Sequence, residues 1–535
     1  MTRRELMTRL GVGLTGATLA GVVAAHISAS PVVRQALAAQ QSPEVGPTPT
    51  PDATGFAPRD GGTLRFGNIG GFLTLEGQTV GPEGSNDQLR VIWEQLISLD
   101  ANHQAQPMLA ESWQFANNNQ QITFNLRHGV QFHSGRELTS DDVKFSLLRL
   151  QDPKIGSVVT PPMMTMTGVD TPDRYTVVVN ASRPWIEVFD VLNRAAIIDP
   201  VTLQSDGLAK PTGTGAFMFA EYAQGDHLRL VKNPNYWQPG LPHLDEVLVS
   251  IYANAQAADV ALEAGALDLV SVGMPLTDLI RLQADPMYQV LINQASGATW
   301  AVCYNCTRPP TDNKMVRQAL GYALDRKRIA DTVWHGLEPP IVLPWNSTSP
   351  AYDASKNSAY AFDLDTARAL LAQAAPTTTT LEITWAAGPP EFETMAQIYQ
   401  SDLQQIGLDV TLKPIEGPAY VQYANSLQYQ GIRLATYGQA NLSPASSAIS
   451  PLYAPQSNFS GFQDDAYTQL INELTSETDP ARQQQLYAQV NDYYLDQSWV
   501  QQIVPNPEHV VAQANVHGLR YDMRSGLVLG EVWLS

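Results

Sequence analysis

Apolar and polar residues alternate along several short segments of the chain, and this alternation predicts β-strands. In residues 121–126, Ile122, Phe124 and Leu126 fall on one face and polar residues on the other. A period of two is that of a half-buried strand. Comparable runs predict further strands at 63–69, 174–181, 228–233, 247–253, 381–387 and 408–415.

Longer segments place apolar residues three or four positions apart, which is the spacing of an amphipathic helix. We expect helices at 90–100, 255–264, 315–336, 366–375, 392–407 and 481–497. Gly265, Gly336 and Gly407 follow three of these segments and are typical helix ends. Strands that alternate with helices of this length indicate α/β lobes with mixed sheets.

The stretch 124–147 holds two histidines and several charges, so it resembles a chemical site at first sight. Thr139 and Asp142 have the spacing of a capping box, however, and precede a predicted buried stripe of Val143, Leu147 and Leu148. His128 and His133 lie five positions apart across a glycine, a poor spacing for two metal ligands on one strand face. We therefore interpret the stretch as scaffold.

The N-terminal residues have the pattern of an export signal. Arg3 and Arg4 precede the uncharged, Gly- and Ala-rich stretch 10–25, and Ala36-Leu37-Ala38 offers a cleavage site. Residues 1–38 are thus predicted to be a twin-arginine-type signal, and the protein to be exported to the periplasm or cell surface. The uncharged stretch 10–33 is long enough to span a bilayer, so a retained anchor is the alternative. Residues 39–61, rich in Pro and Thr, are predicted to be a disordered linker.

Composition narrows the function further. A chain of 535 residues is too long for one core, and a net charge of −20 argues against nucleic acid or an anionic membrane as partner. Cys303 and Cys306 are the only cysteines. In an exported protein they either close a short disulfide or serve as small apolar residues in a strand.

The sequence offers no recognisable catalytic centre. It contains no GxSxG, HExxH or Walker motif and no paired zinc-ligand motif, and its nine histidines are scattered. We expect neither an enzyme nor a cofactor or metal site.

Three segments together resemble the solute-binding proteins of ABC importers, in the group of oligopeptide- and dipeptide-binding proteins (solute-binding protein family 5). One is the Leu-Ala-x-Ser-Trp and Leu-Arg-x-Gly-Val-x-Phe-His-x-Gly pattern within 107–147. The second is Gly-Thr-Gly-Ala-Phe at 213–217 with Asn-Pro-x-Tyr-Trp at 233–237. The third is Val-Arg-x-Ala-Leu followed by Ala-Leu-Asp-Arg within 316–326.

The resemblance implies an α/β fold in which two hinged lobes form a periplasmic-binding-protein-like clamp with mixed sheets. Lobe I would comprise 62–88, 196–298 and 503–535, with an extra subdomain inserted at 89–195, and lobe II would comprise 299–502. Such a protein, expected to be a monomer, binds its solute between the lobes and delivers it to membrane permease subunits. A sensory or chaperone-like receptor on the same fold, or a secreted hydrolase, is the alternative.

The resemblance also points to a ligand-binding loop, in which this chain departs from the family pattern. Peptide-binding members carry a Gly-Trp…Asp segment whose aspartate pairs with the ligand's ammonium group. Here Gly438 matches, Gln439 replaces the tryptophan, and no acid occurs before Pro444. A buried ammonium without a carboxylate would cost several kcal/mol, so we expect a neutral, hydroxyl-rich oligosaccharide or a peptide held through its backbone. The candidate ligand-binding residues are Gly438, Gln439, Asn441, Trp345, Trp385 and Tyr437, although each tryptophan could instead be a packing residue.

Overall fold

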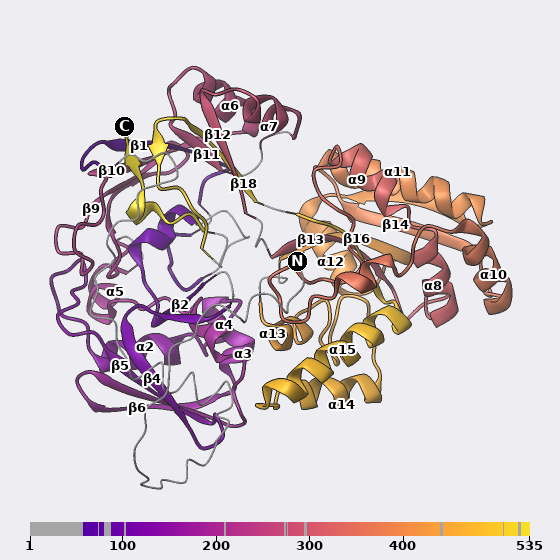
Figure 1. Cartoon of the computed structure of the whole chain (residues 1–535), viewed down its shortest axis with the longest axis horizontal. Coiled ribbons are helices and arrows are strands. Elements are labelled where there is room, and N and C mark those ends of the chain that lie inside the picture. The colour runs from indigo at the N-terminus through magenta and orange to yellow at the C-terminus, as the bar shows by residue number, and fades with distance from the viewer. Residues whose placement is uncertain are drawn as a thin grey trace, which may run out of the picture. The chain divides into compact units, whose positions relative to one another are not determined.

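The computed structural model describes residues 57–72, 74–79, 87–100, 103–207, 210–271, 274, 276–293, 297–438, 442–506, 508–522 and 526–535. The strands within these residues form three larger sheets and two small two-stranded ones. Figure 1 shows the strands and helices of these sheets. Each larger sheet has its own hydrophobic cluster or clusters.

The first sheet has seven strands in the order β12-β18-β11-β1-β10-β9-β8. Its central strand β1 runs parallel to β10 and β11, whereas the outer pairs are antiparallel. Helices α6 (Ala255–Glu263) and α7 (Leu276–Gln283) share a buried cluster with β11 and β18. The strands are β1 (Thr63–Ile69), β8 (Phe217–Ala223), β9 (His227–Lys232), β10 (Glu246–Tyr252), β11 (Leu269–Ser271), β12 (Tyr288–Ile292) and β18 (His509–Gln513).

A second, antiparallel sheet of four strands lies between β1 and β8 in the sequence, in the order β4-β5-β7-β6. Helices α2 (Ser140–Arg149) and α4 (Val188–Leu192) contribute to its buried cluster, which draws on residues 96–197. The strands are β4 (Ala110–Ala116), β5 (Gln121–Leu126), β6 (Met166–Asp173) and β7 (Thr176–Ala181). Shorter elements around it are η1 (Asp87–Ile92), β2 (Ile97–Leu99), β3 (Ala105–Pro107), η2 (Pro153–Ile155), α3 (Thr160–Met163) and α5 (Pro200–Asp206).

The third sheet has five strands in the order β15-β14-β16-β13-β17. Strand β14 runs parallel to both neighbours, and β13 is antiparallel to β16 and β17. The strands are β13 (Ala298–Tyr304), β14 (Thr380–Ala386), β15 (Asp409–Ile415), β16 (Gly431–Gly438) and β17 (Val500–Pro505).

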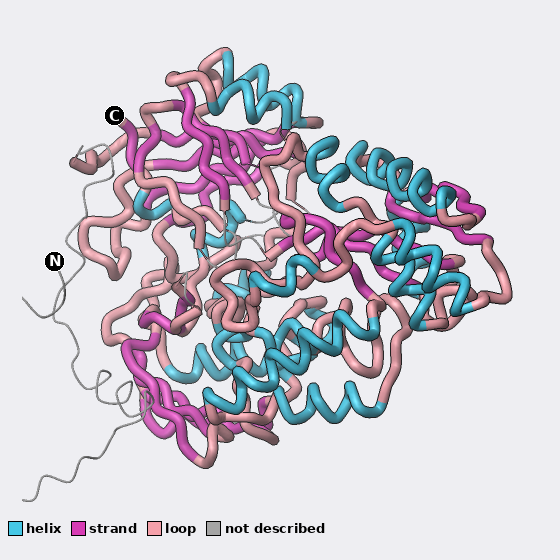
Figure 2. Tube along the Cα trace, turned by 45° about the vertical axis from the view of Figure 1, so that its right-hand side comes forward, coloured by secondary structure: helices cyan, strands magenta, loops and turns pink. Residues whose placement is uncertain are grey.

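Helices cover both faces of this five-stranded sheet (Figure 2). Along β13, Trp300 and Val302 point into one cluster with α8 to α11, and Ala301 and Cys303 into another with α13 to α15, as the period of two requires. The helices are α8 (Lys314–Tyr322), α9 (Arg326–Val333), α10 (Leu364–Ala374), α11 (Pro390–Gln405), α12 (Gly417–Asn425), α13 (Pro444–Ala448), α14 (Asp465–Leu474) and α15 (Pro480–Gln497). The remaining elements are η4 (Ala354–Ser358), β19 (Val516–His517), η5 (Leu529–Glu531) and β20 (Trp533–Leu534).

Two chain crossings join the seven-stranded and five-stranded sheets. One lies between β12 and β13, and the other between β17 and β18. The crossings bond to each other, because Asn293 N donates to Glu508 O at 2.8 Å and Asn506 N donates to Ala298 O at 2.9 Å. Strand β17 stays paired with β13 through Pro505, three residues beyond the boundary at 502 expected from the sequence.

Most predicted elements are confirmed. Strands occur at 63–69, 121–126 and 409–415, and Gly265 and Gly407, both with positive φ, follow α6 and α11. Asp479 caps α15 by accepting Arg482 N at 2.8 Å. In α2, the carboxylate of Asp142 accepts Thr139 N at 2.8 Å, as the capping-box spacing predicted.

Three predictions about helices are wrong. Residues 90–100 form η1 and β2, because the carbonyls of Ile92 and Glu94 bond to Gly215 N and Ile197 N instead of continuing a helix. Residues 315–336 form two helices, α8 and α9, since the Asp325 side chain accepts Arg328 N at 2.9 Å and starts a new one. Leu148, expected to be buried in α2, is 40% exposed.

None of the helices in the described part of the chain is both long and apolar enough to cross a membrane.

Candidate functional site

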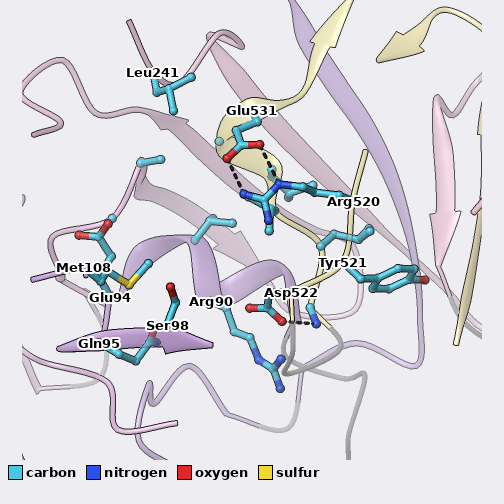
Figure 3. Close-up of a pocket in the computed structure, with 18 of the residues that line it drawn as sticks. Arg90, Glu94, Gln95, Ser98, Met108, Leu241, Arg520, Tyr521, Asp522 and Glu531 are labelled. Carbon is cyan, nitrogen blue, oxygen red and sulfur yellow. Dashed lines mark hydrogen bonds and ion pairs between the residues drawn. The ribbon is translucent and has the colours of Figure 1, made fainter. Parts of the chain in front are cut away.

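A pocket of about 560 Å³ opens beside the first crossing (Figure 3). Its described lining residues come from 90–108, 215–241, 291–293 and 520–531, and none comes from 299–502. The volume falls within the range of small-molecule sites. Because Ile292 and Asn293 line it, a molecule in this pocket would contact the chain where it leaves the seven-stranded sheet.

The pocket wall carries charges of both signs. Arg520 and Glu531 form a two-bond ion pair, with Arg520 Nε donating to Glu531 Oε2 at 2.8 Å. This pairing raises the pKa of Arg520. Figure 3 shows Arg90 and Asp522 below this pair, and Asp522 accepts Gly526 N at 2.9 Å. A ligand here would meet guanidinium and carboxylate groups as well as apolar carbon.

Glu94 anchors the wall of the pocket. Its carboxyl group, in a side chain only 4% exposed, accepts Thr214 Oγ1 at 2.8 Å, Tyr236 OH at 2.8 Å and Trp237 Nε1 at 2.9 Å. Burial raises the pKa of Glu94 to about 7, while the three donors oppose that rise. The Gly-Thr-Gly and Asn-Pro-x-Tyr-Trp motifs of the sequence therefore meet at one buried carboxyl group.

His133 is part of the same scaffold. Its Nε2 lies 2.9 Å from Gly215 O, and Gly213 N donates to its Nδ1 at 3.4 Å. Burial lowers the pKa of His133 to about 4, so the ring is neutral at physiological pH. His128 lies elsewhere, exposed and stacked on Tyr175 at 3.8 Å between ring centroids. In the described residues, no three His, Cys, Asp or Glu side chains form a group that could hold a metal ion.

Of the six ligand-binding residues suggested by the sequence, the four that the structure describes (Gly438, Trp345, Trp385 and Tyr437) do not line this pocket. Gly438 ends β16 and pairs with Ala298 at the crossing, and Tyr437 beside it packs edge-on against Phe459. Gln439 and Asn441 lie outside the described residues.

The two candidate tryptophans are buried on opposite sides of the five-stranded sheet. Trp345 packs in the cluster with α13 to α15, and its Nε1 donates to Asn491 Oδ1 at 2.6 Å. Trp385 packs in the other cluster, on β14. Neither indole presents a face to solvent in this structure, so packing describes both better than ligand stacking.

Cys303 and Cys306 are free thiols in the structure, so the disulfide alternative is not realised there. Cys303 is fully buried in the cluster with α13 to α15, and Cys306 Sγ lies 3.5 Å from Tyr304 O. Burial raises the pKa of Cys303 to about 12 and that of Cys306 to about 11. The cysteines thus behave as small apolar residues, the other reading of the spacing.

Sequence reasoning missed Arg90, Glu94, Arg520 and Asp522. The one available signal was the charge cluster at 520–524, which lies in an otherwise apolar C-terminal segment. Nothing in the sequence connects that cluster to Arg90 or Glu94.

Comparison with known proteins agrees with this architecture. Residues 104–460 match the model of the bacterial extracellular solute-binding proteins, family 5 Middle. The chain is 26% identical over 437 residues to heme-binding protein A of Haemophilus influenzae, covering 74% of this chain and 78% of the relative. It is 28% identical over 452 residues to di/tripeptide-binding protein 1 of Pseudomonas aeruginosa, covering 77% of this chain and 83% of the relative.

A solved structure is similar over most of the chain. The binding protein AgaA in complex with agropinic acid, from A. tumefaciens R10, superposes with a TM-score of 0.76 at 25% identity. The superposition covers 89% of this chain and 99% of that one. Because the family model matches well over half of the sequence, the chain belongs to the bacterial extracellular solute-binding proteins of family 5, a family of binding proteins and not of enzymes.

Proposed function

We propose that this protein captures a peptide-like or oligosaccharide ligand between two hinged lobes and delivers it to the permease of an ABC importer. Its role as the extracytoplasmic solute-binding component of such an importer follows from its family. The ligand class, the lobe boundaries and the residues that bind the ligand are the proposed part.

The observation that carries the proposal is the pair of crossings. The seven-stranded sheet, with its inserted four-stranded sheet, is assigned to lobe I, and the five-stranded sheet to lobe II. The chain passes from one to the other at the crossings near 293–298 and 505–509, and these are bonded to each other. Such a connection allows hinged closure, in which a ligand that contacts both lobes favours the closed state.

The ligand would contact the pocket beside the first crossing and the loop that follows Gly438. The pocket supplies Arg90 and Asp522, and the loop supplies Gln439 and Asn441. Trp345 and Trp385 are buried in lobe II. Of the three aromatic candidate residues, Tyr437 is therefore best placed to contact a ligand.

The names of the relatives include a peptide binder and binders of other compounds. The P. aeruginosa relative is named for di- and tripeptides, the H. influenzae relative for heme, and AgaA was solved with agropinic acid. The loop after Gly438 contains no acid to pair with a free ammonium group. This difference favours ligands held through hydroxyl groups or backbone amides.

Export through a twin-arginine-type signal in residues 1–38 also remains a proposal, as do its retention as an anchor, the linker at 39–61 and a monomeric state. These residues lie outside the described part of the chain except for 57–61. Their support is the residue pattern alone.

Thermal-shift screening tests the ligand class. Ligand-free protein is heated with di- to hexapeptides, with their N-acetylated forms, and with cello- and other oligosaccharides, because a ligand that binds only the folded state raises Tm. We expect stabilisation by oligosaccharides, or by peptides irrespective of N-acetylation. Stabilisation by free-amine peptides that is lost on N-acetylation would show that another acid binds the ammonium. Recovery of the bound compound chemically unchanged after prolonged incubation distinguishes binding from turnover.

A further inference from the structure

Residues 183–190 of the inserted subdomain, here called the latch segment, contact lobe II at three points. They end in α4, and Figure 1 shows α4 beside α13 of lobe II. The contacts are a hydrogen-bonded carboxylate at Asp190, an apolar contact at Ile186 and a guanidinium contact at Arg183. They lie far along the sequence from their partners and do not depend on the crossings.

Asp190 makes the most specific of these contacts. Its Oδ2 accepts Ser446 Oγ at 2.6 Å and Ser443 N at 3.1 Å. The Asp190 side chain is 6% exposed and Ser446 is 8% exposed, so the bonds are largely shielded from water. Hydrogen bonds to an ionised carboxylate are about twice as strong as neutral ones. Two residues of lobe II therefore hold one charged group of the subdomain.

Ile186 adds an apolar contact that is directed away from the core of its own subdomain. Its neighbours Trp185 and Val188 are buried in the subdomain's own cluster, whereas Ile186 packs against the lobe II cluster that contains α13 to α15. The segment therefore has one face in its own core and another on the opposite lobe. Burial of that second face ends when the lobes separate, which gives the contact a hydrophobic contribution to closure.

Arg183 completes the set. Its Nη1 donates to Thr475 O at 2.7 Å, and the guanidinium also pairs with the buried carboxylate of Glu187 four positions along the segment. Glu187 thus fixes the direction in which Arg183 reaches lobe II. Removing Arg183 would leave Glu187 buried without its partner, so this residue is a poor choice for a test.

We propose that the latch segment holds the two lobes closed in the absence of ligand, through Asp190 and Ile186, and thereby sets how tightly every ligand binds. Contacts that stabilise the closed state raise the fraction of molecules competent to retain ligand, and apparent affinity scales with that fraction. Ser443 lies directly after the loop that follows Gly438, so the latch also fixes one end of the proposed ligand-binding loop. This inference rests on the lobe division of the proposed function and deepens it.

The test uses ligand-free, full-length protein and two independent measurements. Small-angle X-ray scattering reports the radius of gyration, and hydrogen exchange reports protection of the Ser443 amide in peptides spanning 442–450. The variants are Asp190→Ala and Ile186→Ala. The matched control is Asp170→Ala, because Asp170 is an exposed acid of the same subdomain whose carboxylate accepts only Asn180 Nδ2 within that subdomain, at 3.0 Å.

We expect both latch variants to have a larger radius of gyration than the unmodified protein, and the control to match it. Exchange at Ser443 should be roughly tenfold faster in Asp190→Ala. An unchanged radius and unchanged exchange in both latch variants would overturn the proposal. Ser446→Ala removes one donor from the lobe II side and leaves the subdomain intact, so the prediction stays testable if Asp190→Ala fails to fold. Since no ligand is present, these outcomes are independent of whether the ligand screen succeeds.

Discussion

The indole N–H of Trp237 donates to the carboxyl group of Glu94 at 2.9 Å, across 143 positions of sequence. Tyr236 and Thr214 donate to the same group. The relationship brings together two family motifs and the pocket wall at one buried residue. It also leads to the first prediction.

Glu94→Ala should destabilise the protein by about 3 kcal/mol, since it leaves one buried donor and two partly buried donors without an acceptor and opens a cavity. Urea denaturation followed by tryptophan fluorescence measures the change. Glu111→Ala, at an exposed position of β4, is the control and should change stability by less than about 0.5 kcal/mol. A similarly small effect of Glu94→Ala would show that the carboxyl group does not organise this region.

Asp259 predicts a pH dependence of stability. The side chain is 5% exposed, neither carboxyl oxygen has a hydrogen-bond partner in the structure, and burial together with Asp278 and Glu263 raises its pKa to about 6. A carboxyl group whose pKa rises on folding contributes stability that is fully present below its unfolded pKa, near 3.9, and is lost as pH rises through about 6. Asp259→Asn should therefore raise Tm at pH 7.5 and leave it unchanged at pH 4.

Glu94 adds a decline in the same direction at higher pH, so the informative quantity is the difference between variants at each pH. Asp206→Asn, at an exposed end of α5, serves as control. If Tm of Asp259→Asn follows that of the unmodified protein over the whole pH range, ionisation of the Asp259 carboxyl group does not destabilise the folded protein.

The state of the two cysteines predicts how their thiols react in native and in denatured protein. Cys303 is buried and Cys306 partly buried, and both are protonated in the folded protein, because burial raises the pKa of Cys303 to about 12 and that of Cys306 to about 11. Ellman's reagent at pH 8 should therefore react slowly with native protein and quickly with both thiols in denaturant. A count of zero in denaturant without reductant would instead establish the disulfide.

Substitutions of Trp345 and Tyr437 should affect protein stability and ligand binding differently. Trp345→Phe removes the donor to Asn491 in a packed cluster and should cost roughly 1–3 kcal/mol of stability. It should leave the ligand-induced shift in Tm unchanged for any compound identified by the screen. Tyr437→Ala should reduce that shift with a smaller loss of stability. The reverse result would restore Trp345 as a ligand-binding residue.

Local patterns were sufficient where the determining contacts are local. The strand at 121–126 follows from alternation because one of its faces is buried, and the helix expected at 481–497 begins where the Asp479 side chain caps it. The segment 90–100 has helical spacing, yet its carbonyls bond to residues 197 and 215, which no local pattern reveals. In residues 90–100, tertiary hydrogen bonds therefore outweigh the local helix propensity.

The candidate site was harder to predict for the same reason. An aromatic residue in the sequence carries no indication of whether it faces a ligand or a core, and the position of Trp345 is decided by Asn491, 146 residues away. Arg90 and Arg520 line one pocket from opposite ends of the chain. The missing acid after Gly438 could be seen in the sequence because it is a departure from a local motif.

The antiparallel pairing of β13 with β17 places the two ends of the segment 298–505 next to each other, with Thr299 opposite Pro505. That segment contains a complete sheet and two hydrophobic clusters. Adjacent ends and a core of its own are the properties of a domain that tolerates insertion or excision. The five-stranded sheet and its helices could thus be exchanged between relatives as one continuous piece of gene, which would leave the seven-stranded sheet unchanged.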